Sequence, residues 1–155
     1  MSIVDSEVDF VSGLNQKRVW DHVTNADHAQ VSINFKDGLQ AIFINSDLAA
    51  ARKPKFYVLG TKGALIGDWD ESAGGLVADL PAIITLHRAD GSSDVIGHIA
   101  QAPHSFYASL VSYLHDATPM SVVAEQSRDV VAIMQAAEES ALANGKPVTP
   151  LLLRA

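Results

Sequence analysis

The stretch SVVAEQSRDVVAIMQAAEESALANGKPVTPLLL (residues 121–153) predicts one long helix that ends at a glycine and is followed by a short strand. Alanine is frequent in it, and no proline interrupts the helical part. Asn144-Gly145 followed by Pro147 is a typical helix stop. Helical spacing divides the side chains into a stripe that packs on the protein and an opposite, exposed side. The predicted stripe holds Ser127, Ile133, Met134, Ala137 and Ala141, and the exposed side holds Arg128, Gln135 and Glu139.

Three hairpins precede this helix in the sequence. The first is the clearest, because apolar and polar residues alternate over residues 29–36 before the turn Asp37-Gly38. Its second strand, LQAIFINSDLA, has apolar residues on both faces, which is typical of a strand covered on both sides. Two further hairpins are predicted over residues 55–69 and 81–100, each with a glycine in its turn. A short strand over residues 8–11 opens the chain.

The spacing of the apolar residues changes after His104, from the alternation of strands to the spacing of a helix, which continues up to residue 117. The order of strands, then two helices, then a strand predicts an α+β fold. We expect an open, predominantly antiparallel β-sheet with helices packed on one face. The other face would then be available for oligomerisation.

Length and composition limit the possible functions. The 155 residues, of which 48% are hydrophobic, predict one compact domain over residues 1–155. A net charge of −7 disfavours binding to nucleic acid and to anionic membrane surfaces. The chain has no cysteine, so thiolate chemistry and disulfides are excluded, and the N-terminus lacks the pattern of a signal peptide. These features favour a cytoplasmic protein.

Five short motifs, in this order, give the chain a family resemblance. They are Asp37-Gly38, Gly60-Thr61-Lys62-Gly63, Phe106-Tyr107 with Leu110, Pro119-Met120-Ser121-Val122, and the helix and strand from Gln126 to Val148. In this order they resemble the C-terminal domain of the glucose-fructose oxidoreductase/inositol dehydrogenase/MocA (Gfo/Idh/MocA) family.

The resemblance implies the substrate-binding and oligomerisation domain of an NAD(P)-dependent oxidoreductase that acts on a sugar, polyol or related alcohol. In that family a separate N-terminal Rossmann domain binds NAD or NADP through Gly-x-Gly-x-x-Gly, and the catalytic lysine lies in Glu-Lys-Pro. Neither motif occurs here. Gly60, Gly63 and Gly67 have the wrong spacing and lie where strands are predicted. Both Lys-Pro pairs of the chain lack the preceding glutamate. The resemblance therefore implies that this chain alone binds no cofactor and holds no catalytic residue. Its partners would be the missing Rossmann domain and further copies in a dimer or tetramer.

Candidate substrate contacts are few. Trp69 at a strand end, and His104 and Tyr107 at the start of the shorter helix, are the candidates for one wall of a substrate pocket. For Phe106 a place in the core is the favoured interpretation. The acidic residues Asp68, Asp70 and Glu71 are interpreted as a solvated turn.

Six histidines raise the alternative of a metal site, and they are His22, His28, His87, His98, His104 and His115. None has the helical spacing with a glutamate that a zinc protease needs, so no metal site is predicted. A stand-alone, noncatalytic α+β binding or scaffold module remains the alternative to the oxidoreductase domain.

Overall fold

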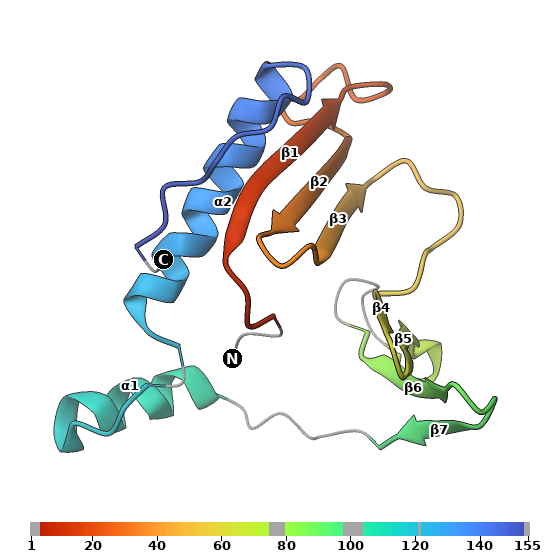
Figure 1. The fold of residues 1–155 in the computed structure, drawn as a ribbon, viewed down its shortest axis with the longest axis vertical. Coiled ribbons are helices and arrows are strands. Elements are labelled where there is room, and N and C mark those ends of the chain that lie inside the picture. The colour runs from red at the N-terminus through yellow and green to blue at the C-terminus, as the bar shows by residue number, and fades with distance from the viewer. Residues whose placement is uncertain (1–3, 75–79, 98–103, 121, 154–155) are drawn as a thin grey trace. The chain divides into compact units, whose positions relative to one another are not determined.

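The computed structural model describes residues 4–74, 80–97, 104–120 and 122–153, and the chain forms two compact units. The helical unit comprises Met1–Ala49 and Phe106–Ala155. The hairpin unit comprises Ala50–Ser105. Figure 1 shows the elements of both units. That residues 1–155 act as a single domain stays a prediction.

The sheet of the helical unit has three antiparallel strands in the order β1-β2-β3. They are β1 (Val8–Gln16), β2 (His28–Phe35) and β3 (Gln40–Ser46). The predicted hairpin is confirmed, because Asp37-Gly38 lies in the turn between β2 and β3 and Gly38 has a φ of 85°, which favours glycine. The first strand continues well beyond residue 11, where the sequence ended it.

Strand β3 is apolar on both faces, as predicted. Phe43 pairs with Val31 on the face toward the long helix and is 62% exposed, so that face is only partly covered at this edge of the sheet. Ile42 and Ile44 point to the other face and are also exposed.

The helices of this unit are α1 (Ser105–Asp116) and α2 (Ala124–Leu142). Figure 1 shows α2 lying along β1, which confirms a helix packed on one face of the sheet. Helix α1 has no comparable contact with the strands of this unit among the described residues. Asn144 and Gly145, with φ values of 59° and 81°, end α2 as the sequence predicted. After them the chain forms only a single-residue bridge, Val148 with Val11, rather than the predicted strand.

The buried stripe of α2 agrees only in part with the predicted one, because Ala137 is buried and Ile133 packs against the core as expected. Ala136, Ala137 and Ser140 are the buried residues, whereas Met134 is 65% exposed and Ser127 is also exposed. The reason is a close helix–strand crossing that only small side chains allow. There the helix passes directly over Gly13 of β1, whose missing Cβ would lie 2.0 Å from the carbonyl oxygen of Ala137.

Ser140 joins three segments at this crossing. Its hydroxyl accepts a hydrogen bond from the Gly13 backbone N–H at 2.9 Å and donates one to the Lys146 carbonyl at 2.6 Å. Ser140 is fully buried, so these bonds satisfy polar groups that water cannot reach. Strand, helix and C-terminal segment are thereby fixed at one point.

The hairpin unit contains a four-stranded antiparallel sheet in the order β4-β5-β6-β7. Its strands are β4 (Phe56–Gly60), β5 (Gly63–Trp69), β6 (Ala82–Arg88) and β7 (Ser93–Ile96), and η1 (Glu71–Ala73) follows β5. Both later hairpins are thus confirmed within the described residues. The α+β class and the antiparallel pairing are confirmed as well, although the described strands form two sheets where the sequence predicted one.

Candidate functional site

Trp69 lies at the end of β5 and is held from two directions. Its indole N–H donates a hydrogen bond to the Lys53 carbonyl at 2.8 Å. The Lys55 ammonium lies 4.6 Å from the centre of the ring, and the Arg52 guanidinium carbon lies at 5.7 Å. Cations over an indole face are attracted by its π-electrons, so the side chain is fixed in place. Trp69 therefore presents a partly exposed aromatic ring that these contacts hold in one orientation.

His104 and Tyr107 lie at the start of α1. His104 precedes the helix with a φ of 60°, a left-handed conformation that is uncommon for a residue with a side chain. The Tyr107 ring is 64% exposed and packs edge-on against Phe106 with ring centres 5.6 Å apart. Phe106 is itself 56% exposed, so the interpretation as a core residue was wrong. Trp69 belongs to the hairpin unit and Tyr107 to the helical unit.

The other polar groups that the sequence singled out have local roles. Asp70 caps the η1 turn by accepting the Ser72 backbone N–H at 3.0 Å, and Glu71 forms an ion pair with Arg52 at 3.1 Å. His115 contacts its neighbour Asp116 at 2.7 Å. Within the described residues, no three histidine or acidic side chains are close enough to hold a metal ion. His98 lies outside the described residues.

The three glycines of residues 60–67 lie in strands. Gly60 ends β4, Gly63 opens β5, and the Phe56 ring lies over Gly67, 2.3 Å from the position that a Cβ would take. They serve a tight hairpin and close packing on the sheet. This is the interpretation that their spacing predicted.

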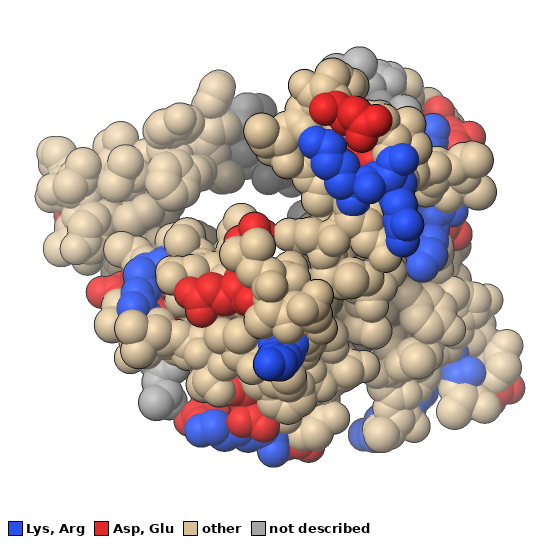
Figure 2. Space-filling view, turned by 90° about the horizontal axis from the view of Figure 1, so that it is seen from above, with Lys and Arg blue, Asp and Glu red and all other residues tan. Residues whose placement is uncertain are grey.

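Charged side chains are spread over the surface. In the view of Figure 2, Lys and Arg gather in small groups with Asp or Glu nearby, and no continuous basic face is present. The described part of the chain also contains no helix with the length and apolar character needed to cross a bilayer.

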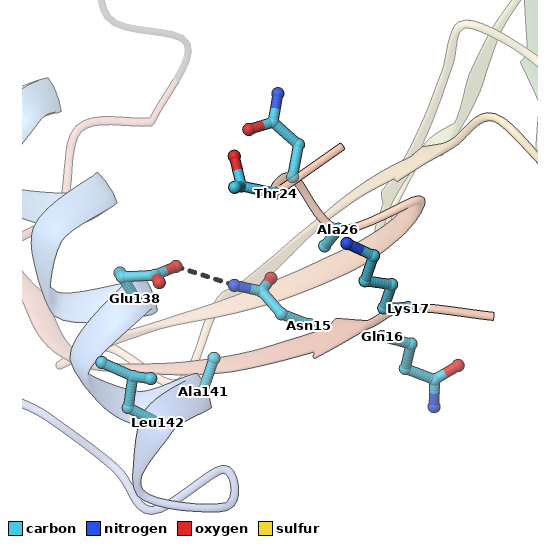
Figure 3. A pocket seen from close by; sticks show the side chains of 9 residues that line it. Asn15, Gln16, Lys17, Thr24, Ala26, Glu138, Ala141 and Leu142 are labelled. Carbon is cyan, nitrogen blue, oxygen red and sulfur yellow. Dashed lines mark hydrogen bonds between the residues drawn. The ribbon is translucent and has the colours of Figure 1, made fainter. Parts of the chain in front are cut away.

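A pocket of about 500 Å³, which the sequence did not predict, lies where β1 ends beside the last turns of α2. It is lined by residues 15–17 of the strand and its extension, by residues 24–26 of the following loop, and by Glu138, Ala141 and Leu142 of α2. Figure 3 shows Asn15 in the middle, where its amide donates a 2.7 Å hydrogen bond to Glu138. Six of the lining side chains are polar or charged, and three are apolar.

The loop that forms one wall of this pocket is held by Asp27. The Asp27 side chain is 1% exposed, and its carboxylate accepts the backbone N–H groups of Arg18, Val19 and Trp20 at 2.7 to 3.0 Å. Burial raises the pKa of Asp27, but the N–H groups of Val19, Trp20 and Arg18 stabilise the charged form and hold the pKa below its ordinary value.

The Asp27 backbone adds to this anchor. Its N–H donates to the Gln16 carbonyl at 3.1 Å, and its carbonyl accepts the Asp47 N–H at 3.0 Å. One residue thus ties together the end of β1, the loop and the segment after β3. The sequence offered no signal for this role, because a single aspartate before a strand is common and the N–H donors become visible only in the folded loop.

Several solved structures contain the same fold. A Klebsiella pneumoniae protein described as an oxidoreductase matches 96% of this chain with a TM-score of 0.77 and 20% identity. An NAD-binding protein from Listeria innocua matches 96% of it with a TM-score of 0.70 and 24% identity. A Desulfitobacterium hafniense protein described as an NADPH-dependent oxidoreductase matches 92% of it with a TM-score of 0.73 and 18% identity.

This chain has the fold of one part of these proteins. It spans only 46%, 43% and 42% of their respective lengths. The oxidoreductase-domain fold that the sequence resemblance implied is therefore confirmed. No protein-family model and no curated protein matches the chain.

Proposed function

We propose that this chain is the C-terminal, substrate-binding and oligomerisation domain of an NAD(P)-dependent oxidoreductase acting on a sugar, polyol or related alcohol. The observation that carries the proposal is the match of nearly the whole chain to less than half of two proteins described as oxidoreductases and of one NAD-binding protein. The order of the sequence motifs supports the C-terminal position and the substrate class. The cytoplasm is the compartment that fits this function and a chain without cysteine.

In this proposal the cofactor, NAD or NADP, binds to a Rossmann domain of the parent protein, outside these residues. A dinucleotide pyrophosphate needs a glycine-rich turn at a helix N-terminus, whereas the glycines of residues 60–67 lie in a hairpin. The parent would move a hydride between a substrate carbon and the nicotinamide. This chain would form one wall of the substrate pocket and exclude water from it.

We assign Trp69, His104 and Tyr107 as candidates for that wall. Trp69 supports the assignment best, because its partly exposed indole is held by the Lys53 carbonyl and by two cations over its ring. His104 and Tyr107 each present an exposed side chain that can form hydrogen bonds. None of the three is assigned a catalytic role.

The test begins with the coding DNA upstream of Met1. We expect the reading frame to continue into a strand, a Gly-x-Gly-x-x-Gly turn and a Glu-Lys-Pro motif. A stop codon and a ribosome-binding site there would instead favour the stand-alone binding or scaffold module.

NADH titration of the 155-residue chain, followed by the fluorescence of the reduced nicotinamide, tests whether the cofactor binds outside this chain. We expect no saturable binding by this chain and binding by the longer protein. Tight binding of NADH to the isolated chain would contradict both the domain proposal and the scaffold alternative.

Oligomerisation through a sheet face is the remaining part of the proposal. By the strand register, Tyr57, Leu59 and Val95 share one face of the hairpin unit's sheet. Their side chains are 58%, 73% and 68% exposed. Exposed apolar side chains on a sheet face are stabilised when a partner covers them, and most oligomers of soluble proteins are symmetric assemblies of one chain.

We expect the wild-type chain to sediment as a dimer or tetramer and the double variant Leu59→Lys/Val95→Lys to sediment mainly as a monomer. Two charges in a face of this kind would have to be desolvated on association, which is unfavourable. Thr61→Lys, in the β4–β5 turn, is the matched control and should leave the mass unchanged. A monomeric wild-type mass at working concentration would contradict this part of the proposal.

A further inference from the structure

Two opposite charges line the pocket at the end of β1 without pairing with each other. Figure 3 shows Glu138 on the α2 side, Lys17 on the strand side, and Asn15 between them. No ion pair of the described residues involves either Lys17 or Glu138. Each makes one internal hydrogen bond, from the Lys17 ammonium to the Val23 carbonyl and from Asn15 to Oε2 of Glu138. Two ammonium N–H groups and carboxylate Oε1 therefore remain for a ligand.

The remaining lining is neutral. Gln16, Thr24 and Asn25 offer both donors and acceptors, while Ala141 and Leu142 offer an apolar surface. The formal charge of the pocket is zero, so it attracts neither a polyanion nor a polycation. Its volume is about 500 Å³, and it is open to solvent, because six of its nine lining residues are exposed.

The walls of the pocket are held in place before any ligand binds. Gly13 and Ser140 fix β1 against α2, and the Asp27 carboxylate fixes the loop through three backbone N–H groups. A preformed pocket loses little conformational entropy on binding, which permits even a small ligand to bind.

We infer that this pocket binds a small zwitterion of the amino-acid class. The ammonium group of the ligand contacts Oε1 of Glu138, and its carboxylate contacts the Lys17 ammonium. The inference uses only residues of the helical unit and does not rest on the proposed oxidoreductase function.

The test is a ¹H–¹⁵N NMR titration of the 155-residue chain, followed at the amides of Asn15, Thr24, Asn25 and Glu138. Glycine and 4-aminobutyrate are zwitterions of two lengths, while butyrate and butylamine each carry only one of the charges. We expect at least one zwitterion to bind with a dissociation constant of about 1 mM. Butyrate and butylamine should each bind roughly tenfold more weakly, because each lacks one charged hydrogen bond.

Variants separate charge recognition from general binding. Glu138→Gln should weaken zwitterion binding roughly tenfold and leave butyrate binding unchanged. Lys17→Gln should weaken it by a similar factor and leave butylamine binding unchanged. Glu139→Gln is the matched control, because Glu139 is next in sequence but bonds Gln135 outside the pocket. Unchanged amide signals of residues 18–20 would show that the loop remains folded in each variant.

The inference would be overturned by the absence of saturable shifts with both zwitterions or by equal binding of a zwitterion and of butyrate or butylamine. Equal effects of Glu138→Gln and Glu139→Gln would overturn it too. Binding of glycerol as tight as that of the zwitterions would also overturn it, since a neutral polyol needs neither charge. None of these results bears on the oxidoreductase proposal, which the upstream DNA and the NADH titration test separately.

Discussion

Gly13→Ala is expected to lower the free energy of unfolding of the helical unit by about 3 kcal/mol, at the upper end of typical overpacking costs. The new Cβ would lie 2.0 Å from the carbonyl oxygen of Ala137 and 2.8 Å from its carbonyl carbon. Both are backbone atoms of a long helix, so no side-chain rotation can relieve the clash. Strand and helix would have to separate, which also weakens the hydrogen bond from Gly13 to Ser140.

Urea denaturation followed by the helical circular dichroism signal, to which α2 as the longer helix contributes most, measures this effect. Gly97→Ala is the control, because a Cβ there meets no atom within 4 Å and the backbone does not have the left-handed conformation. It should leave the midpoint almost unchanged. Equal midpoints for Gly13→Ala and the wild type would show that the close crossing of α2 over β1 is wrong.

Asp27→Ala is expected to have the second-largest effect, with a fall of several degrees in the melting temperature of the helical unit. The change removes the acceptor of three backbone N–H groups at residues 18–20 and leaves them without their partner. Hydrogen exchange at these amides should accelerate more than exchange in β1 and β2, because the loop is released first.

Asp47→Ala is the matched control for this prediction. Asp47 is also an aspartate, but it is exposed, and only its backbone N–H bonds Asp27. Its replacement should change neither the melting temperature nor the exchange of the loop amides. Equal exchange of these amides in Asp27→Ala and Asp47→Ala would contradict the anchoring role of the Asp27 carboxylate.

The contribution of Asp27 should depend on pH with a defined sign. Its pKa in the folded protein lies below the ordinary value of 3.8, so the folded state favours the charged carboxylate. The difference in stability between the wild type and Asp27→Asn should therefore be complete above about pH 4 and shrink as the pH falls below it. A difference that grows on acidification would contradict the hydrogen-bonded carboxylate.

The long helix shows how far the sequence alone could lead. Its existence and its stop at Asn144-Gly145 followed from periodicity and turn chemistry, which act over a few residues. Its buried stripe did not, because Met134 was expected inside and lies outside. A hydrophobic pattern favours large apolar residues for the interface, whereas the buried residues of this helix are the small Ala136, Ala137 and Ser140.

The candidate sites were also predictable only in part from the sequence. Trp69 could be selected from the sequence as an aromatic at a strand end, but its two cations and its carbonyl partner are contacts of the folded hairpin unit. No pattern in the sequence predicted the pocket between β1 and α2. It brings residues 15–26 beside Glu138, more than a hundred residues later, and no local rule predicts such a pair.

The sequence by itself determined the hairpins, both helices, the α+β class and the resemblance to an oxidoreductase domain. These depend on alternation, helical spacing and turn residues, each of which is encoded within a short segment. Only the tertiary structure decided the separate sheets, the helix–strand crossing at Gly13, the anchor at Asp27 and the pocket beside Glu138. The physical reason is that these features depend on which backbone groups and side chains meet when distant segments pack together.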